Sequence, residues 1–154
     1  MPVIVVGADT EYGLAVAEAL SGRDGEVRAF VTDPNAAQPL RTLGIKVAIG
    51  DVSDASHIAG AAHGAFSVVM IADAALDNRE RSFAASYDAL LKAWAEGLRE
   101  AEVSRGIWVA PGEDLPEPLA SSGIPNAVVD TRNRSPQEVG AEVARLDDLA
   151  ELPE

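Results

Sequence analysis

Short apolar runs alternate with helical patterns along the whole chain. Six runs have the length and composition of β-strands: Val3–Val6, Glu26–Thr32, Lys46–Ile49, Ser67–Ile71, Gly106–Ala110 and Asn126–Asp130. The fourth is nearly continuously apolar, which is typical of a strand buried on both faces of a sheet.

Helical periodicity fills the spaces between these runs. The predicted helices are Glu11–Ser21, Ala36–Leu43, Ala55–Ala62, Arg79–Glu102, Leu119–Ser122 and one from Ser135 to about Leu149. Ser135, Pro136 and Glu138 have the order of an N-cap, a first helical residue and a capping-box partner. Gly44 follows the second helix, where a C′ glycine is expected.

Strict alternation of strand and helix predicts an α/β fold with one doubly wound parallel sheet. Right-handed crossovers give six strands in the Rossmann order 3-2-1-4-5-6, with no separate substrate domain. A ligand would bind at the carboxyl ends of strands one and four, where the order reverses. We expect a single domain over residues 1–149 and an acidic tail at 150–154.

Composition narrows the possible roles. The 154 residues contain no cysteine, so disulfides, thiolate metal sites and a cysteine nucleophile are excluded. The net charge of −13, with only 12 scattered Lys and Arg residues, disfavours binding to nucleic acid or to an anionic membrane. Neither a membrane span nor a signal peptide is evident, so we expect a cytoplasmic protein.

The turn after the first strand carries the most information. Val3–Val6 runs into Gly7-Ala-Asp-Thr-Glu-Tyr-Gly13, and an Ala-rich helix follows. This order of strand, glycine-bounded turn and helix opens a dinucleotide-binding unit. Gly7 permits the tight turn and Gly13 lets the helix pack on the strand, but Thr10 stands where a middle glycine would admit the pyrophosphate.

Two carboxylates also lie in this turn, at Asp9 and Glu11. A helix N-terminus attracts anions, and these side chains can satisfy that field themselves. They would repel a pyrophosphate by about 1 kcal/mol each at a wet surface, and the turn holds no Lys or Arg to offset them. Two interpretations stay open: weak dinucleotide binding, in which the Thr10 hydroxyl donates to a phosphate, or a relic turn that only caps the helix.

The whole chain resembles the NmrA-like group of atypical short-chain dehydrogenases/reductases, which bind NAD(P). The matching segments are Val3–Gly13, Ala15–Leu20, Val27–Pro34, Leu43–Asp54, Ala61–Ala72, Gly106–Ala110 and Leu119–Asp130. The most specific of them is the G-D-x-x-D pattern that begins at Gly50. The resemblance implies an NAD(P) site on the turn and at the carboxyl ends of the central strands.

Catalytic features of that group are missing. The fifth strand ends in Ala110-Pro111-Gly112 without a serine, and no Tyr or Lys follows Trp108. The residues at the end of strand two are Thr32 and Asp33, where NADP-binding members often carry Arg. We therefore assign no catalytic residue and expect NAD to be favoured over NADP.

Each remaining candidate for cofactor binding has a structural alternative. Asp33 would bind ribose hydroxyls or cap the next helix. The resemblance implies that Asp51 contacts the adenine edge, with Val52 beside the ring, and the alternative is a capping network. Ala72 and Asp73 end strand four at the crevice, where Asp73 is a polar contact or a cap.

Three other features of the sequence bear on ligand or partner binding. By resemblance Tyr12 lies near the nicotinamide end, and the alternative is packing under the turn. His57 and His63 are six residues apart, on different helix faces and without a third ligand, so no metal site is predicted. The helix Arg79–Glu102 would span about 36 Å.

An apolar stripe on that long helix, from Phe83 to Leu98, predicts a homodimer or a protein partner through residues 79–102. The sequence thus indicates a minimal NAD(P)-binding Rossmann protein that is non-catalytic, either a redox or dinucleotide sensor or an interaction subunit. The alternatives are a small NAD(P)H-dependent, flavin-reductase-like oxidoreductase whose cofactor supplies the chemistry, and a structural partner with a relic site.

Overall fold

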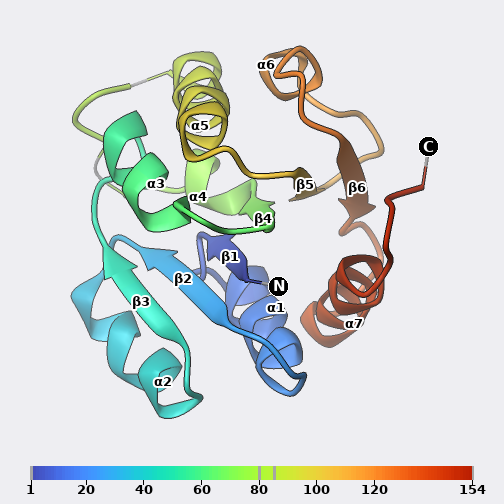
Figure 1. The fold of residues 1–154 in the computed structure, drawn as a ribbon. Coiled ribbons are helices and arrows are strands. Elements are labelled where there is room, and N and C mark those ends of the chain that lie inside the picture. Colours follow the sequence, from blue (N-terminus) through green and yellow to red (C-terminus); the bar gives the residue numbers. More distant parts are fainter. Residues whose placement is uncertain (1, 80, 85, 154) are drawn as a thin grey trace.

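The computed structural model describes residues 2–79, 81–84 and 86–153. It contains one six-stranded parallel sheet in the order β3-β2-β1-β4-β5-β6, which confirms the predicted fold (Figure 1). The strands are β1 (Val3–Val6), β2 (Val27–Val31), β3 (Lys46–Ile49), β4 (Ser67–Ile71), β5 (Arg105–Ala110) and β6 (Asn126–Asp130).

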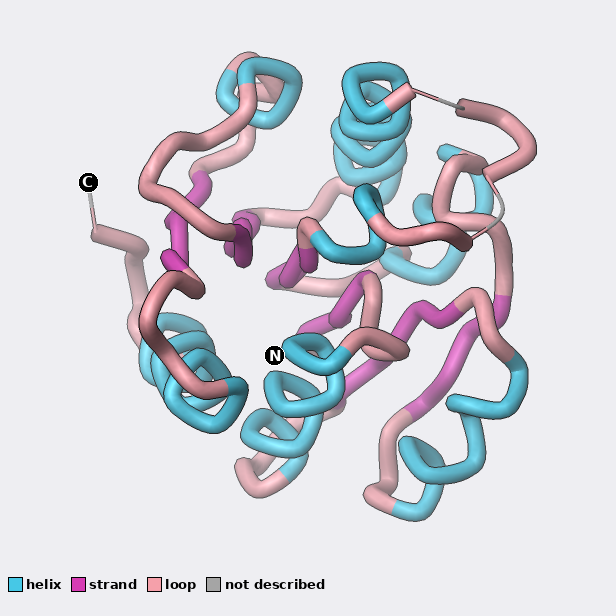
Figure 2. Tube along the Cα trace, turned by 180° about the vertical axis from the view of Figure 1, so that it is seen from behind, coloured by secondary structure: helices cyan, strands magenta, loops and turns pink. Residues whose placement is uncertain are grey.

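Helices cover both faces of the sheet, and Figure 2 shows the same arrangement from behind. The helices are α1 (Glu11–Ser21), η1 (Pro34–Ala36, a 3-10 turn), α2 (Ala37–Thr42), α3 (Ala55–Ala62), α4 (Asp73–Leu76), α5 (Tyr87–Ala101), α6 (Glu117–Ala120) and α7 (Pro136–Asp147). Alternate residues of each buried strand serve opposite faces: Ile4 and Val6 pack with α3, α5 and α6, whereas Val3 and Val5 pack with α1, α2 and α7.

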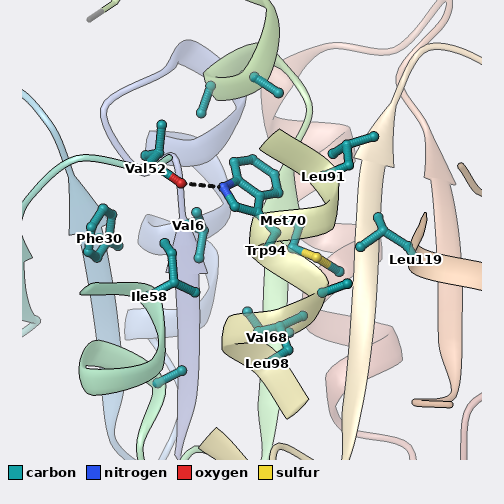
Figure 3. Close-up of a cluster of buried hydrophobic side chains, with 14 of the residues drawn as sticks. Val6, Phe30, Val52, Ile58, Val68, Met70, Leu91, Trp94, Leu98 and Leu119 are labelled. Carbon is teal, nitrogen blue, oxygen red and sulfur yellow. Dashed lines mark hydrogen bonds between the residues drawn. The ribbon is translucent and has the colours of Figure 1, made fainter. Parts of the chain in front are cut away.

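Trp94 ties α5 to the sheet edge where the strands end. Its indole is buried between Val52, Ile58 and Leu91, and Nε1 donates a 2.8 Å hydrogen bond to the Val52 carbonyl (Figure 3). A buried indole N–H needs such a partner, because an unpaired polar group in the core is costly. The bond sets the position of the β3–α3 connection, which leads into the crevice.

The other face is closed by close packing of α1 on α7. A Cβ at Gly140 of α7 would lie 2.7 Å from the Ala15 carbonyl oxygen, so only glycine allows this approach. Arg105 is buried at the start of β5 and donates to the Leu149 carbonyl at 2.6 Å and to the Asp147 carbonyl at 2.6 Å. Arg23 also pairs with Asp147, at 2.6 Å, so the end of α7 is held from two sides.

The predicted continuous helix Arg79–Glu102 is wrong. The chain forms the short helix α4, leaves helical geometry at Asp77, and begins α5 only at Tyr87, with Ser86 as its N-cap. The 15 residues of α5 span about 22 Å rather than 36 Å. Leu90, Leu91, Trp94 and Leu98 of the expected stripe are core residues.

A bilayer crossing needs a helix of about 20 apolar residues. Over residues 2–79, 81–84 and 86–153, every helix falls short of that requirement.

The contact between α1 and α7 predicts an unusual cost for a small substitution. We expect Gly140→Ala to lower the free energy of unfolding by about 1–3 kcal/mol, because the new methyl group collides with backbone. Gly60→Ala in α3 is the matched control: its Cβ would meet nothing within 4 Å, so a gain of about 0.5–1 kcal/mol is expected from helix propensity. Urea unfolding of both variants measures the difference, and equal effects would contradict the packing argument.

Candidate functional site

The turn between β1 and α1 has the geometry that a phosphate-binding turn requires. Gly7 has a φ of +93°, and a Cβ there would lie 2.8 Å from the Ala74 side chain. A Cβ at Gly13 would lie 1.9 Å from the Gly7 carbonyl oxygen. Both glycines therefore have the roles predicted for them, a tight turn and a close helix–strand contact.

Thr10 caps α1 with its own side chain. Its hydroxyl donates to the Gly7 carbonyl at 2.6 Å and accepts from Gly13 N at 2.9 Å. In this geometry the single hydroxyl hydrogen is donated to Gly7, so a bond from Thr10 to a phosphate would have to replace that bond.

The N–H groups of Glu11 and Tyr12 have no hydrogen-bond partner among the residues that the structure describes. They are the first two N–H groups of α1, which a helix leaves free for an anion. The Glu11 side chain is exposed beside them, and Tyr12 packs against the core shared by α1 and α7. The turn thus has two N–H groups without a described partner and one exposed carboxylate beside them.

Asp9 points away from α1, toward the end of β2. One of its oxygens, Oδ2, accepts from Thr32 N at 2.9 Å and from Asp33 N at 3.2 Å. The other, Oδ1, accepts from the guanidinium of Arg79 at 2.9 Å, and the same Arg79 nitrogen donates to Thr32 Oγ1 at 3.2 Å. Asp9, Thr32 and Asp33 are therefore brought together at one point of the crevice.

Arg79 comes from the segment after α4 and is the important residue that the sequence analysis missed. Its side chain is 10% exposed and that of Asp9 is 5% exposed. Asp77 holds the guanidinium from the other side, with Nη2 and Oδ2 2.8 Å apart. Burial lowers the pKa of Arg79, but its hydrogen bonds with Asp77 and its pairing with Asp9 outweigh burial and raise that pKa above its ordinary value.

Asp51 lies in a hydrogen-bonded network on the other side of the same segment. It accepts from Ser53 N at 2.8 Å, from Ser53 Oγ at 2.6 Å and from Ser82 N at 2.8 Å. Burial would raise the pKa of the Asp51 carboxyl, yet these hydrogen bonds hold the pKa below its ordinary value. Val52 is fully buried in the core rather than open to a ring, and Phe83 N donates to Ser53 Oγ at 2.9 Å.

Ala72 and Asp73 lie at the end of β4, as predicted. Ala72 is buried and Asp73 is half-buried in the first turn of α4. Burial raises the pKa of the Asp73 carboxyl, and the nearby carboxylates of Asp77 and Glu11 add to this, while Arg79 acts in the opposite direction. Asp73 is thus a carboxyl that holds its proton more tightly than usual, in the predicted crevice.

The structural alternative for Asp33 is realised. The Asp33 carboxylate accepts from Asn35 N at 2.9 Å and caps η1. His57 and His63 are exposed, and no group of three or more metal-ligating side chains is found over the described residues.

Comparisons with known proteins agree with this geometry. A model of a family described as NAD(P)H-binding matches residues 7–120, which include the turn and the ends of β2, β3 and β4. A search of curated protein sequences found no match.

Several solved structures share the fold. The triphenylmethane reductase of Citrobacter sp. has a TM-score of 0.79 at 14% identity, with 98% of this chain and 66% of that chain covered. The NADPH-dependent quinone oxidoreductase QOR2 of Escherichia coli, solved with NADPH, has a TM-score of 0.77 at 18% identity over 97% of this chain and 66% of that one. ChuY of E. coli O157:H7, described as an anaerobilin reductase, has a TM-score of 0.72 at 19% identity and is covered to 92%. The chain therefore spans just under two thirds of the first two proteins.

The raised pKa of Asp73 predicts how the stability of the fold depends on pH. Because its pKa is raised by folding, the fold gains stability at this group as the pH falls through the raised pKa, and loses that gain as the pH rises. Asp73→Asn should therefore be more stable than the native chain at pH 7, by at most about 1 kcal/mol because solvent screens a half-buried charge. The difference should vanish below about pH 4.

Thermal unfolding at a series of pH values measures this difference. Glu100→Gln, at an exposed position of α5, is the control and should leave the pH profile unchanged. A native chain that is more stable than Asp73→Asn at pH 7 would contradict the prediction.

Proposed function

Because the chain belongs to the NAD(P)H-binding family of Rossmann-fold proteins, we propose that it binds NAD(H) in preference to NADP(H) and acts as a dinucleotide or redox sensor or an interaction subunit. The observation that carries this proposal is the turn Gly7–Gly13, whose two glycines keep the required close contacts and whose helix offers the N–H groups of Glu11 and Tyr12. The residues present therefore fit the diphosphate of such a cofactor, which would supply hydride chemistry when bound.

The same turn supports weak binding. The Thr10 side chain lies where a middle glycine would leave room, and the carboxylates of Glu11 and Asp73 lie near the phosphate donors. Arg79 is a cation close to the turn, but it is paired with Asp9 and Asp77. Phosphate binding must therefore rely on backbone N–H groups against unfavourable charge.

The crevice also supports a role without catalysis. β5 ends at Ala110 and Pro111 follows, so neither residue offers a hydroxyl to a bound substrate. Nothing after Trp108 supplies the Tyr-Lys pair that activates a carbonyl in short-chain dehydrogenases.

A second candidate function is a small reductase in which the cofactor performs the chemistry. Asp73 favours it, since a carboxyl with a raised pKa in the crevice is a suitable proton donor for a hydride acceptor. The similar solved structures described as a triphenylmethane reductase and a quinone oxidoreductase support the same class.

Calorimetric titration with NAD, NADH, NADP and NADPH tests the proposal. We expect dissociation constants weaker than about 10 μM, with NADH bound more tightly than NADPH. Glu11→Gln should tighten NADH binding about five-fold by removing one charge of about 1 kcal/mol, whereas Glu18→Gln, exposed further along α1, should not. Submicromolar binding of NADPH would show that our view of the turn is wrong.

The same preparations separate the two candidate functions. Steady oxidation of NADH by a quinone or a triarylmethane dye, lost in Asp73→Asn, would favour the reductase. Binding without turnover would favour the sensor.

The interaction role depends on the exposed end of the predicted stripe, because Phe83 and Tyr87 are exposed whereas the rest of the stripe is core. Leu76, Phe83 and Tyr87 are 60%, 68% and 39% exposed, and they belong to α4, the following segment and the start of α5. We propose that these exposed apolar side chains contact a second copy of the chain. Light scattering at micromolar concentration should then give twice the monomer mass of 16.0 kDa, and Phe83→Ser should return the monomer. A constant monomer mass would remove the homodimer.

A further inference from the structure

Three hydrogen-bond donors converge on the Asp9 carboxylate. We call them the anion cup: the N–H groups of Thr32 and Asp33, at 2.9 and 3.2 Å, and the guanidinium of Arg79, at 2.9 Å. Asp9 itself is nine-tenths or more buried. Adjacent backbone N–H groups and a guanidinium are the donor set that binds carboxylates and phosphates.

The position of the anion cup in the fold suggests which part of a dinucleotide it would contact. It lies at the carboxyl end of β2, where a Rossmann fold receives the 2′ position of the adenosine ribose. An acidic residue at this place accepts from the ribose hydroxyls, and an arginine accommodates a 2′-phosphate. This chain has one of each, Asp9 and Arg79, bonded to each other.

We propose that the Asp9 carboxylate is a built-in occupant of the anion cup, and that Asp9, rather than Asp33, makes the chain discriminate against 2′-phosphorylated dinucleotides. This inference rests on the proposed function, since it specifies how that same site chooses its ligand.

The number of acceptor positions left on the Asp9 carboxylate allows a free ribose at the anion cup but not a 2′-phosphate. A carboxylate has about four acceptor positions, and Asp9 uses three of them. One position on Oδ1 is left, enough for a single ribose hydroxyl. A phosphate carries a charge of about −1.5 to −2 and needs the donors that Asp9 occupies.

The anion cup does not depend on Asp9 for its shape. Asp77 holds Arg79 through Nε at 2.8 Å and through Nη2 at 2.8 Å, and the two N–H groups belong to the end of β2. Removing the Asp9 side chain should therefore leave a vacant site that keeps its cation. Asp33 differs, because its carboxylate is exposed and caps η1 instead of facing the cup.

The experiment removes the occupant and measures what enters. We expect Asp9→Ala to bind NADPH and adenosine 2′-monophosphate at least ten-fold more tightly than the native chain by calorimetry, and to reverse the native preference for NADH. Adding Arg79→Met to Asp9→Ala should abolish the gain. Asp33→Asn is the matched control at the same strand end and should leave the ratio of NADH to NADPH affinity unchanged.

Each outcome decides the matter. An unchanged ratio in Asp9→Ala, or a reversed ratio in Asp33→Asn, overturns the inference. If no dinucleotide binds any variant but adenosine 2′-monophosphate binds Asp9→Ala and not its Arg79→Met derivative, the proposed function fails and the anion cup stands. Should Asp9→Ala not fold, Asp9→Asn keeps the shape without the charge and should still shift the ratio toward NADPH.

Discussion

The contact between the Gly7 carbonyl and the backbone of Gly13 is the constraint on which the site depends. A side-chain carbon at Gly13 would lie 1.9 Å from that oxygen, so α1 can approach β1 this closely only without one. The Thr10 hydroxyl bridges the same two residues and closes the turn. As a result α1 begins directly beside the end of β1, and the N–H groups of Glu11 and Tyr12 have no hydrogen-bond partner among the described residues.

Acidic side chains dominate the charge around the turn and the end of β2. Asp9, Glu11, Asp73 and Asp77 lie in this region, and Arg79, from the segment after α4, pairs with Asp9 and Asp77. A partly buried pair of this kind gains little net free energy over apolar side chains, because both ions lose water. In our proposal the pair serves specificity, because the donors at the end of β2 already bind Asp9 before a ligand arrives.

The fold could be predicted because strand length, alternation and crossover handedness all favour one topology. The turn glycines and the positions of Asp33, Asp51 and Asp73 followed from the same order. The conformation of residues 77–79 and 81–84 could not be predicted from periodicity, because it depends on tertiary partners: Asp9 for Arg79, and Asp51 and Ser53 for the N–H groups of Ser82 and Phe83. Two local signals of a break in the helix were present: the alternating charged residues Asp77, Arg79 and Arg81, and the N-cap residue Ser86. The apolar stripe continues across the break and favoured one continuous helix instead.

The packing of α1 on α7 has a consequence for how the molecule forms. Arg23 at the end of α1 and Ala144 in α7 are 121 residues apart in the chain, yet they are hydrogen-bonded. A long loop must close, at a cost in chain entropy, before contacts between such distant segments can stabilise the fold. Such contacts therefore slow folding. The face of the sheet under α1 stays incomplete until residues 136–147 arrive. We therefore expect the rate-limiting event to be the meeting of the first and last helices, with the two cores consolidating at different times.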